Sequence, residues 1–322
     1  MLKLDLKDRK LLYWLDQNSR STNKALAKNV GLTEQAIGYR IKRLQEKGVL
    51  KNVVTFVNTL SLGYQHYKVF IRLHETTEEI EREIMNDLVG NPVIRWVVSL
   101  IGEYDLSFSV LAKTPRDFTK IYDAIEAKFG RYIIEKNIVI NVRSPGFTRD
   151  WLIDGKESRM LEYGTSEKVQ EIDDVDAKII KTISQNARKN VVAIAREINS
   201  TVDVVKYRLK KLKEKNIISG FTLQLDLAEL GYEYYSVLFY THNLSEETEN
   251  RILTFARLHP AVRFTVRTIG NHDLQLELEV KNHAELDGVL KAFRQQFAAH
   301  IRDFEILRVT KEYKYDFFPF QQ

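Results

Sequence analysis

The chain contains the same module twice, and this duplication limits its possible folds more than any other feature of the sequence. Residues 32–50, LTEQAIGYRIKRLQEKGVL, return in residues 200–218 as STVDVVKYRLKKLKEKNII. The same spacing of 168 positions places Gly102 on Gly270, and it does not change along the chain. The two copies therefore share their loop lengths. A period this long is typical of a duplicated domain pair, because the repeats of solenoid proteins are much shorter.

The segment at 144–170 matches neither copy and is predicted to be a linker. It is polar and charged, but Trp151, Leu152 and Ile153 indicate that part of it packs on a neighbouring domain. A length of 322 residues is also more than one domain usually holds. The domains predicted from the repeat are residues 1–60, 64–143, 171–228 and 232–316, with the linker between the second and the third.

The composition narrows the classes of function. The chain has no cysteine, which excludes disulfides, thiolate metal sites and cysteine nucleophiles and fits a cytoplasmic protein. Its first residues, MLKLDLKDRKLL, are charged throughout and lack the apolar core of a secretion signal. Apolar runs such as 97–101 are too short to cross a membrane. A net charge of +5 and an isoelectric point near 9.0 are compatible with an anionic partner.

The first half of each copy has a helical period. Between residues 10 and 48 of the first copy, apolar side chains recur at helical spacing. Thr22 stands where a helix N-cap would be, and Gly31 provides a left-handed turn into a third helix at 33–47. Asparagine occupies both equivalent positions of the second copy. A short strand at 53–57 follows, and the whole pattern predicts a winged helix-turn-helix domain.

The second half of each copy alternates between strand and helix patterns, in the order β-α-β-β-α-β of a ferredoxin-like domain. The expected elements of the first copy are a strand at 68–74, a helix at 78–89, a strand pair at 93–101 and 106–112, a helix at 117–129 and a strand at 133–142. The second copy repeats them from Tyr234 to about Tyr315. The predicted fold class is therefore α+β, with two copies of a winged helix-turn-helix domain followed by a ferredoxin-like domain.

The third helix of each copy has one apolar stripe and one basic face. In the first copy Ile37, Ile41 and Leu44 lie at i, i+4 and i+7, so this stripe is predicted to dock on the first two helices. A three-helix unit with a basic last helix is typical of proteins that read the major groove of DNA. The predicted DNA-binding residues are Thr33, Gln35, Tyr39, Arg40, Lys42, Arg43, Lys206, Tyr207, Arg208, Lys210 and Lys211.

A lysine-rich amphipathic helix can also be a solvated surface without a partner. The charge distribution favours DNA, because residues 1–60 contain twelve Lys and Arg against five Asp and Glu, a local charge of +7 in a chain of +5. In the second copy Asp203 replaces Gln35 at the start of the helix, and acidic residues gather at 171–176. We therefore expect the first copy to dominate DNA binding.

The run from Asp5 to Leu50 resembles the N-terminal domain of the Lrp/AsnC transcriptional regulators. It contains Asp-x-x-Asp-x-x-Leu-Leu near its start, Leu-Ala-x-x-Val-Gly-Leu-Thr at the turn and Arg-Ile-x-Arg-Leu-x-x-x-Gly-Val-Leu at its end. The split motif that follows, with Ile-Gly-Glu-Tyr-Asp-Leu at 101–106, is similar to the effector-binding and oligomerisation domain of that family. The resemblance covers both copies. It implies a DNA-binding regulator that self-associates through its ferredoxin-like domains, and the fusion implies a covalent pseudo-dimer.

The resemblance also implies that a small effector, such as an amino acid, binds near the hairpin between the two central strands. The matching positions are Gly102, Glu103, Tyr104, Asp105, Gly270, Asn271, His272 and Asp273. There the backbone would approach a carboxylate, and the aspartate would accept an ammonium group. The alternative is structural, because Gly-x-x-Asp between two strands also forms a β-turn without a ligand.

No cofactor, metal or catalytic site is predicted. None of the seven histidines has the helical pairing or the cysteine partner that a zinc site favours, and most are expected at the surface or in turns. The sequence contains no glycine-rich phosphate loop and no nucleophile elbow. Two alternatives stay open beside the regulator. Some Lrp-like proteins, often paired or fused, are siroheme decarboxylases that use His and Arg in a tetrapyrrole pocket, and a DNA binder of this kind can also be purely architectural.

Overall fold

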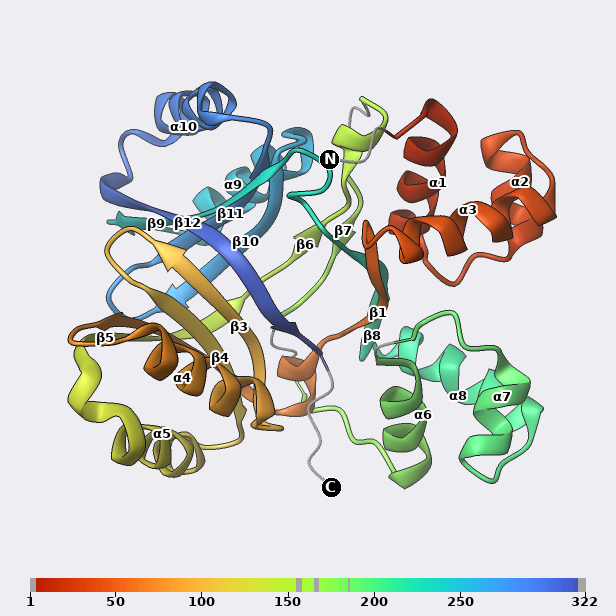
Figure 1. Ribbon diagram of the computed structural model, residues 1–322, viewed down its shortest axis with the longest axis horizontal. Helices are drawn as coiled ribbons and strands as arrows, with labels where there is room; N and C mark the ends of the chain where they lie inside the picture. The colour runs from red at the N-terminus through yellow and green to blue at the C-terminus, as the bar shows by residue number, and fades with distance from the viewer. Residues whose placement is uncertain (1–3, 155–157, 165–167, 185, 318–322) are drawn as a thin grey trace.

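Figure 1 shows a computed structural model of the chain, which describes residues 4–154, 158–164, 168–184 and 186–317. It confirms the predicted α+β class. The two ferredoxin-like halves form one layered body, and the two helix-turn-helix units project from the same side of it. Within the described residues, no helix is long and apolar enough to span a membrane.

Each helix-turn-helix unit has three helices and one strand. The first contains α1 (Leu6–Gln17), α2 (Asn23–Val30), α3 (Glu34–Glu46) and β1 (Leu50–Val57). The second contains α6 (Asp174–Ser184), α7 (Val191–Glu197), α8 (Val202–Glu214) and β8 (Ile218–Leu225). The predicted turn chemistry is confirmed, because Thr22 caps α2, Asn190 caps α7 and Gly31 has a φ of 72°. Asn199 takes the same left-handed conformation in the second unit, with a φ of 51°.

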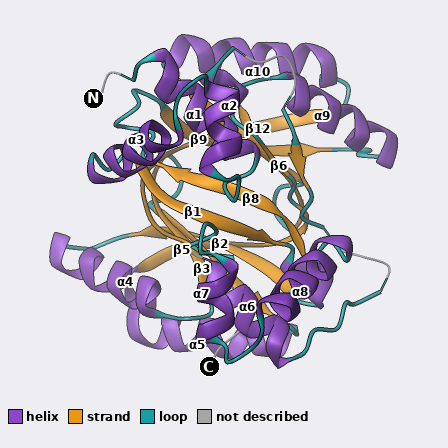
Figure 2. Ribbon diagram, turned by 90° about the vertical axis from the view of Figure 1, so that its right-hand side faces the viewer, coloured by secondary structure: helices purple, strands orange, loops and turns teal. Residues whose placement is uncertain are grey.

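The strands β1 and β8 pair with each other and not within their own units. They form an antiparallel ribbon in which Val54 lies opposite Thr222. Val53, Val57 and Leu223 are buried in one continuous apolar cluster that joins both units. Because this shared core keeps its apolar surface out of water only when the units stay together, it fixes them relative to each other. Figure 2 shows the ribbon between the two units.

Eight strands of the two ferredoxin-like halves close into a ring. The first half contributes β2 (Gln65–Leu73), β3 (Ile94–Ile101), β4 (Leu106–Ala112) and β5 (Ile133–Arg143), and the second half β9 (Glu233–Thr241), β10 (Val262–Ile269), β11 (Leu274–Val280) and β12 (Ile301–Tyr315). Their order is β11-β9-β12-β3-β4-β2-β5-β10, and β10 pairs back with β11. The halves join where β12 meets β3 and where β5 meets β10. Strands that would otherwise end each half at a free edge are therefore paired.

Helices cover the outside of the ring, and a separate core fills part of its inside. The covering helices are α4 (Glu78–Gly90) and α5 (Pro115–Phe129) on the first half, and α9 (Glu246–Leu258) and α10 (His283–Phe297) on the second (Figure 2). Inside the ring, Phe70, Val98 and Val139 of the first half form one cluster with Leu238 and Leu307 of the second. The two halves therefore share a core across their facing sheet surfaces.

The linker is built of short elements that pack on both copies. β6 (Gly146–Phe147) pairs with β10 and with β7 (Met160–Leu161). Trp151 stacks on Tyr232 with ring centroids 3.9 Å apart, and Leu152 is buried in the core that the helix-turn-helix units share. The predicted packing of the apolar linker residues on a neighbouring domain is confirmed. Short 3-10 turns occur at η1 (Thr59–Leu62), η2 (Gly130–Tyr132) and η3 (Asp150–Leu152).

Candidate nucleic-acid interface

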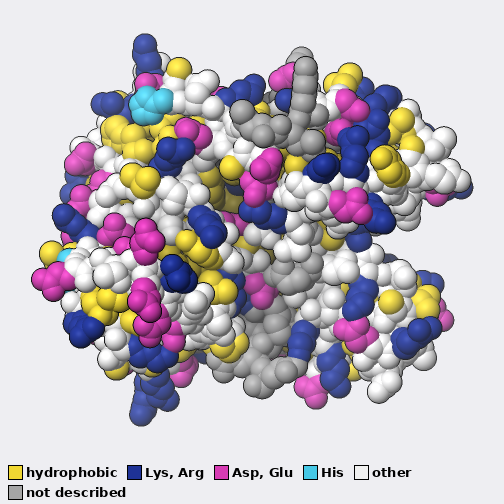
Figure 3. Space-filling view, viewed as in Figure 1, with side chains coloured by type: hydrophobic (Ala, Val, Ile, Leu, Met, Phe, Trp, Pro, Cys, Tyr) yellow, Lys and Arg dark blue, Asp and Glu magenta, His cyan; other side chains and the backbone are white. Residues whose placement is uncertain are grey.

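The predicted reading faces of α3 and α8 are exposed, and the two units that carry these helices lie on the same side of the ring (Figure 1). Tyr39 is 67% exposed and the side chain of Lys42 is 77% exposed. Their equivalents on α8 are similar, since Tyr207 is 58% exposed and the side chain of Lys210 is 75% exposed. Figure 3 shows a gap between the two units, with Lys and Arg side chains on both. We call α3 and α8 the reading helices.

Two of the predicted DNA-binding arginines in the first unit are engaged by carboxylates of the same unit. Arg40 Nη1 lies 2.7 Å from Asp5 Oδ2 and 2.6 Å from Asp8 Oδ1. Arg43 Nη2 lies 2.5 Å from Asp8 Oδ2. Asp8 is only 1% exposed, so these contacts hold α3 against α1. The hydrogen bond from Arg40 to Asp5 is the largest influence that raises the pKa of this guanidinium group.

The second unit repeats this arrangement at equivalent positions. Arg208 Nη1 lies 2.7 Å from Asp173 Oδ2 and 3.2 Å from Asp176 Oδ2. The charge of Asp176 is the largest influence that raises the pKa of Arg208. Both copies retain the two carboxylates and the arginine at equivalent positions. This repetition in the sequence could have indicated that the arginine pairs with carboxylates of its own unit. DNA contact stays a prediction for Arg40, Arg43 and Arg208, whose charges are already balanced within the protein.

The remaining predicted contacts lie on the surface. Thr33 uses its hydroxyl oxygen to cap α3, accepting from a backbone N–H at 3.2 Å. Gln35, Lys206 and Lys211 are exposed. Lys211 Nζ lies 3.0 Å from Glu214 Oε2, but water and salt screen an exposed pair of this kind, so it contributes little to stability. These lysines can therefore exchange a surface carboxylate for a phosphate at small cost.

A reciprocal pair of arginines joins the two units. Arg188 donates three hydrogen bonds, each of 2.8 Å, to oxygen atoms of residues 19–23. Arg20, at the equivalent position of the first unit, donates to the carbonyl oxygen of Ala187. We call these contacts the arginine clasp. Each of these side chains reaches into the other unit. The clasp therefore constrains the placement of the reading helices in addition to the ribbon.

A buried ionic cluster ties the linker to three other parts of the chain. Arg149 Nη1 lies 3.1 Å from Asp16 Oδ1 of α1, and its Nη2 lies 2.9 Å from Glu279 Oε1 of β11. Its Nη1 also donates to the carbonyl oxygen of Leu223 in β8 at 3.2 Å. Burial alone would raise the pKa of Asp16, but Arg149 and Arg263 outweigh burial and lower it. Sequence reasoning missed this cluster, because the linker matches neither copy.

The hairpin glycines predicted to line an effector site pack against the other half of the ring. Gly102 and Gly270 have φ values of 142° and 150°. A Cβ atom on Gly102 would lie 2.8 Å from Leu307 Cδ2, and one on Gly270 would lie 2.6 Å from Val139 Cγ1. Both the backbone conformation and the close approach therefore require glycine at these two positions.

The other hairpin residues mostly have roles within the fold. Asp105 and Asp273 each accept a hydrogen bond from a backbone N–H of a neighbouring strand, at 2.6 and 2.7 Å. Tyr104 and His272 are buried, and burial lowers the pKa of His272 to about 3, so this side chain is neutral. The exposed polar side chains are Glu103, Asp105 and Asn271. Effector binding at the hairpins stays a prediction. In the described part of the chain, no three His, Asp or Glu side chains gather as metal ligands would.

Comparison with known proteins places the helix-turn-helix units in a known class. The winged helix-turn-helix DNA-binding family matches residues 4–51 and 172–219. The chain is 30% identical to the HTH-type transcriptional regulator FL11 of Pyrococcus furiosus over 122 residues, which cover 38% of this chain and 80% of that protein. It is 26% identical to an uncharacterised HTH-type transcriptional regulator of Pyrococcus abyssi over 46% of this chain and 99% of that protein. An uncharacterised regulator of Pyrococcus furiosus is 37% identical over 21% of this chain, but the alignment spans only 46% of that relative.

Among solved structures, that of the siroheme decarboxylase NirDL matches nearly the whole chain. Its TM-score is 0.63 at 12% sequence identity, with 98% of this chain and 94% of that chain covered. The arrangement of both copies and the closed ring is therefore a known fold. At this level of identity the likeness concerns the fold alone.

Proposed function

Since the chain belongs to the Lrp/AsnC family of helix-turn-helix transcriptional regulators, we propose that it is a DNA-binding regulator in which one chain supplies both halves of a dimeric reader. The observation that carries the proposal is the exposure of equivalent Tyr and Lys side chains on α3 and α8, in two units that lie on the same side of the ring. Lysine ammonium and tyrosine hydroxyl groups donate to phosphate oxygens, while a helix in the major groove reaches base edges.

The two reading helices act as one rigid unit in this proposal. The ribbon, the shared core and the arginine clasp all constrain their separation. A fixed pair of helices suits two half-sites about 34 Å apart, one turn of B-form DNA. Because the two copies are covalently joined, their pairing does not depend on protein concentration.

The first unit is proposed to bind more strongly than the second. Asp203 is 96% exposed at the start of α8, where Gln35 stands in α3. A carboxylate near phosphates weakens binding unless it accepts a hydrogen bond from a cytosine amine. The two helices therefore suit unequal half-sites, which an ordinary homodimer would not read.

A small effector at the hairpins and self-association through the ferredoxin-like halves complete the proposal. Isothermal titration calorimetry of the full chain against the amino acids tests the effector. An absence of heat across the whole set would remove the effector from the account without affecting the DNA-binding part.

The spacing between half-sites tests the DNA-binding proposal. A duplex is first selected from a random library with the full chain, and then about five base pairs, half a helical turn, are inserted between its half-sites. We expect the affinity to fall to that of a duplex with a single half-site, roughly 10²–10⁴-fold weaker. Equal affinity at both spacings would contradict the proposal, and a selection that yields no preferred sequence would favour a purely architectural DNA binder.

A second candidate function is siroheme decarboxylation, and the observation in its favour is a pocket beside β8. A space of about 500 Å³ lies between β8 and the second ferredoxin-like half, and its lining includes Lys51 and Arg308. Such cations suit the carboxylates of a tetrapyrrole, and the structurally similar NirDL is a siroheme decarboxylase. However, Lys51 pairs with Asp226 at 2.9 Å and Arg308 with Glu233 at 3.0 Å, so both charges are already matched. Incubation with siroheme and mass spectrometry decide the point, since an unchanged tetrapyrrole excludes the enzyme.

A further inference from the structure

A pocket lies where the two helix-turn-helix units meet the linker. Its volume is about 240 Å³. Asn18, which follows α1 of the first unit, lines it together with Arg159 of the linker. The second unit contributes Lys213 near the end of α8, Asn216 and the buried ring of Phe221. None of the described residues that line this pocket is an aspartate or a glutamate. We call it the junction pocket.

The cations at the junction pocket have no carboxylate to balance them. Lys213 Nζ lies 4.7 Å from the ring centroid of Phe221, and the guanidinium carbon of Arg20 lies 5.5 Å from the same centroid. Arg159 donates to the carbonyl oxygen of Gln17 at 2.7 Å. Within the described part of the chain, none of these three cations forms an ion pair with an aspartate or a glutamate. The pocket therefore carries an uncompensated positive charge.

The pKa of the Lys213 ammonium group shows the same lack of compensation. Burial lowers this pKa first, and the positive charges of Arg20 and Arg159 lower it further. Burial also lowers the pKa of Arg20, followed by the charge of Arg188. By contrast, the carboxylates beside Arg208 raise the pKa of that guanidinium group. A negative charge in the junction pocket would remove an unfavourable interaction that the folded protein otherwise retains.

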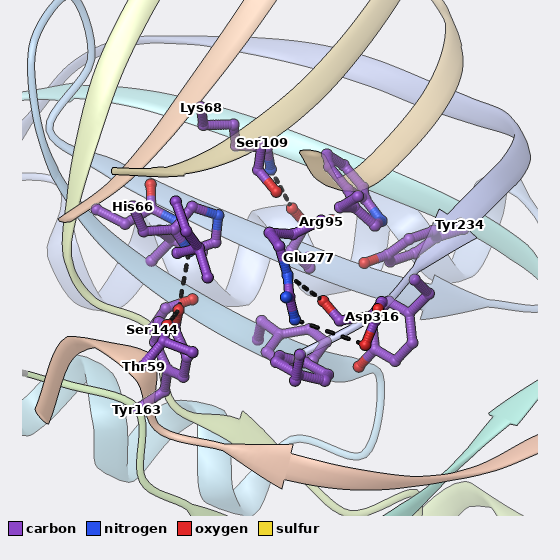
Figure 4. Close-up of a pocket in the computed structure, with 17 residues that line it drawn as sticks. Thr59, His66, Lys68, Arg95, Ser109, Ser144, Tyr163, Tyr234, Glu277 and Asp316 are labelled. Carbon is purple, nitrogen blue, oxygen red and sulfur yellow. Dashed lines mark hydrogen bonds and ion pairs between the residues drawn. The ribbon is translucent and has the colours of Figure 1, made fainter. Parts of the chain in front are cut away.

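The cavity inside the ring differs from the junction pocket, because its charged side chains are paired. Lys68 Nζ lies 2.8 Å from Glu277 Oε1, and Arg95 Nη2 lies 3.6 Å from Asp316 Oδ1 (Figure 4). Each of these cations already has a carboxylate beside it. An anion would therefore gain much less there than at the junction pocket.

The free hydrogen-bonding groups of the junction pocket are donors. Asn18 Oδ1 accepts from the backbone N–H of Arg20 at 3.1 Å, and Asn216 Oδ1 accepts from Ser219 Oγ at 3.0 Å. Because these two amide oxygen atoms are engaged, the amide N–H groups are left to donate to a ligand. Ammonium and guanidinium groups are also donors without an acceptor. A phosphate group matches such a set, since it is an anion with several acceptor oxygen atoms.

The size of the junction pocket allows the phosphate group to belong to a larger molecule. One buried water needs about 10–15 Å³ of such space, so about 240 Å³ accommodates roughly 16 to 24 groups of that size. A phosphate group fills only part of this space. Both a free phosphorylated compound and the backbone of DNA carry such a group.

The duplication builds the surrounding backbone twice but the charge of the pocket once. The backbone contact that joins the units beside Phe221 recurs between Ala187 and Val53, where the N–H donates at 2.7 Å. At this second place the neutral Gln45 stands at the position equivalent to Lys213. The linker occurs once, so its arginine lines only one of the two places. The charged pocket is therefore a feature of one side of the chain.

We propose that the junction pocket binds a phosphate group, with Lys213, Arg159 and the two asparagine amides donating to its oxygen atoms. The group comes either from a free phosphorylated compound or from the backbone of bound DNA. The second source rests on the proposed function, whereas the first does not. Because the phosphate would contact both units and the linker, its binding stabilises their placement by mass action.

Calorimetric titration of the full chain at constant ionic strength tests the free compound. The probes are inorganic phosphate, pyrophosphate and adenosine monophosphate, with acetate as the anion that lacks a phosphate group. For this source we expect at least one of the three phosphates to bind at one molecule per chain and to raise the unfolding temperature. Acetate should bind at least about tenfold more weakly, because it offers less charge and fewer acceptor atoms.

Lys213→Gln should weaken phosphate binding at least about tenfold, because the variant loses a charged donor. Gln45 shows that the equivalent helix position accepts glutamine, so the variant should fold. Its unfolding temperature without ligand should not fall, since the substitution removes repulsion from the pocket. Lys120→Gln makes the same charge change on an exposed position of α5 and should bind phosphate as the wild type does.

The salt dependence of DNA affinity tests the second source. If the DNA backbone supplies the phosphate, Lys213→Gln should reduce the magnitude of the salt slope by about 0.9, Lys120→Gln should leave it unchanged, and the free phosphates should give no heat. If a free compound supplies it, the titration should give heat and Lys213→Gln should leave the slope unchanged. If the chain binds no DNA at all, the proposed function fails and the titration alone decides.

Three results would overturn the proposal of a phosphate site. The first is an absence of heat from all three phosphates together with a salt slope that Lys213→Gln does not alter. The second is binding of acetate as strong as that of the phosphates. The third is binding of phosphate by Lys213→Gln with the affinity of the wild type.

Discussion

Replacing Arg149 with methionine is expected to lower the free energy of unfolding by about 3–5 kcal/mol, because the change leaves two buried carboxylates without their shared partner. Asp16 is fully buried and Glu279 is 3% exposed. Both lie within 3.1 Å of the guanidinium group, which also contacts the wing strand β8. Urea unfolding monitored by circular dichroism measures the change. Arg159→Met is the matched control, since Arg159 is an exposed linker residue with one hydrogen bond to Gln17.

The effect of Arg149→Met should depend on pH. In the wild type the pKa of Asp16 is lowered, so its contribution to stability is present above its unfolded pKa of about 3.9 and is lost as the pH falls through the folded value. Without Arg149, burial favours the protonated carboxyl, and the folded variant takes up protons at a higher pH. The difference in free energy of unfolding between the wild type and Arg149→Met should therefore become smaller as the pH falls from 7 to about 4.5. A loss equal to that of Arg159→Met, or a deficit that widens in acid, would contradict this account.

Replacing Arg188 with alanine is expected to lower the free energy of unfolding by about 2–3 kcal/mol, the second largest effect that we expect. The variant loses three hydrogen bonds from a charged group to the other unit, and part of this loss is recovered by solvation because the site is half-buried. Arg20→Ala should cost less, since Arg20 donates only one such bond across the clasp. Urea unfolding of both variants checks the order.

Arg188→Lys separates charge from geometry at the clasp. Lysine keeps the charge but has no planar fork, so it should recover less than half of the loss. The same variant should also bind DNA with less discrimination between half-site spacings, because the units are held less firmly. Full recovery by lysine, or a larger loss in Arg20→Ala than in Arg188→Ala, would show that the clasp does not act through these hydrogen bonds.

The helices and strands of each copy could be predicted, but the closure of the ring could not. Caps and turns such as Thr22 and Gly31 depend on local sequence, so they could be predicted. Ser107 and Ser109 alternate with apolar residues in β4, a pattern typical of a strand with one face in water. Both serines are buried, because the other half of the ring covers that face. The pairings responsible, β12 with β3 and β5 with β10, join residues far apart in the chain, and no local period encodes them.

Part of the candidate nucleic-acid interface could also be predicted from the sequence, and part could not. The helical period fixes which side of α3 is buried, so the exposure of Tyr39 and Lys42 was predictable. The engagement of Arg40 depends on the position of α1, which the helical pattern of α3 does not contain. Arg95 of β3 and Glu277 of β11 line one cavity between the two halves of the ring. This juxtaposition could not be predicted, because the two residues come from different copies and meet only when the ring closes.

The central claim is that equivalent lysines on both reading helices contact one DNA molecule at the same time. The most direct measurement is the salt dependence of DNA affinity for the wild type, Lys42→Ala, Lys210→Ala and the double variant. Each lost phosphate contact reduces the magnitude of the slope of log affinity against log salt by about 0.9. We therefore predict that each single variant reduces this magnitude by about 0.9 and that the double variant reduces it by about 1.8. Lys120→Ala with Lys291→Ala, on the exposed faces of α5 and α10, should leave the slope unchanged. A double variant with the slope of Lys42→Ala alone, or a slope that none of the substitutions on the reading helices alters, would contradict the claim.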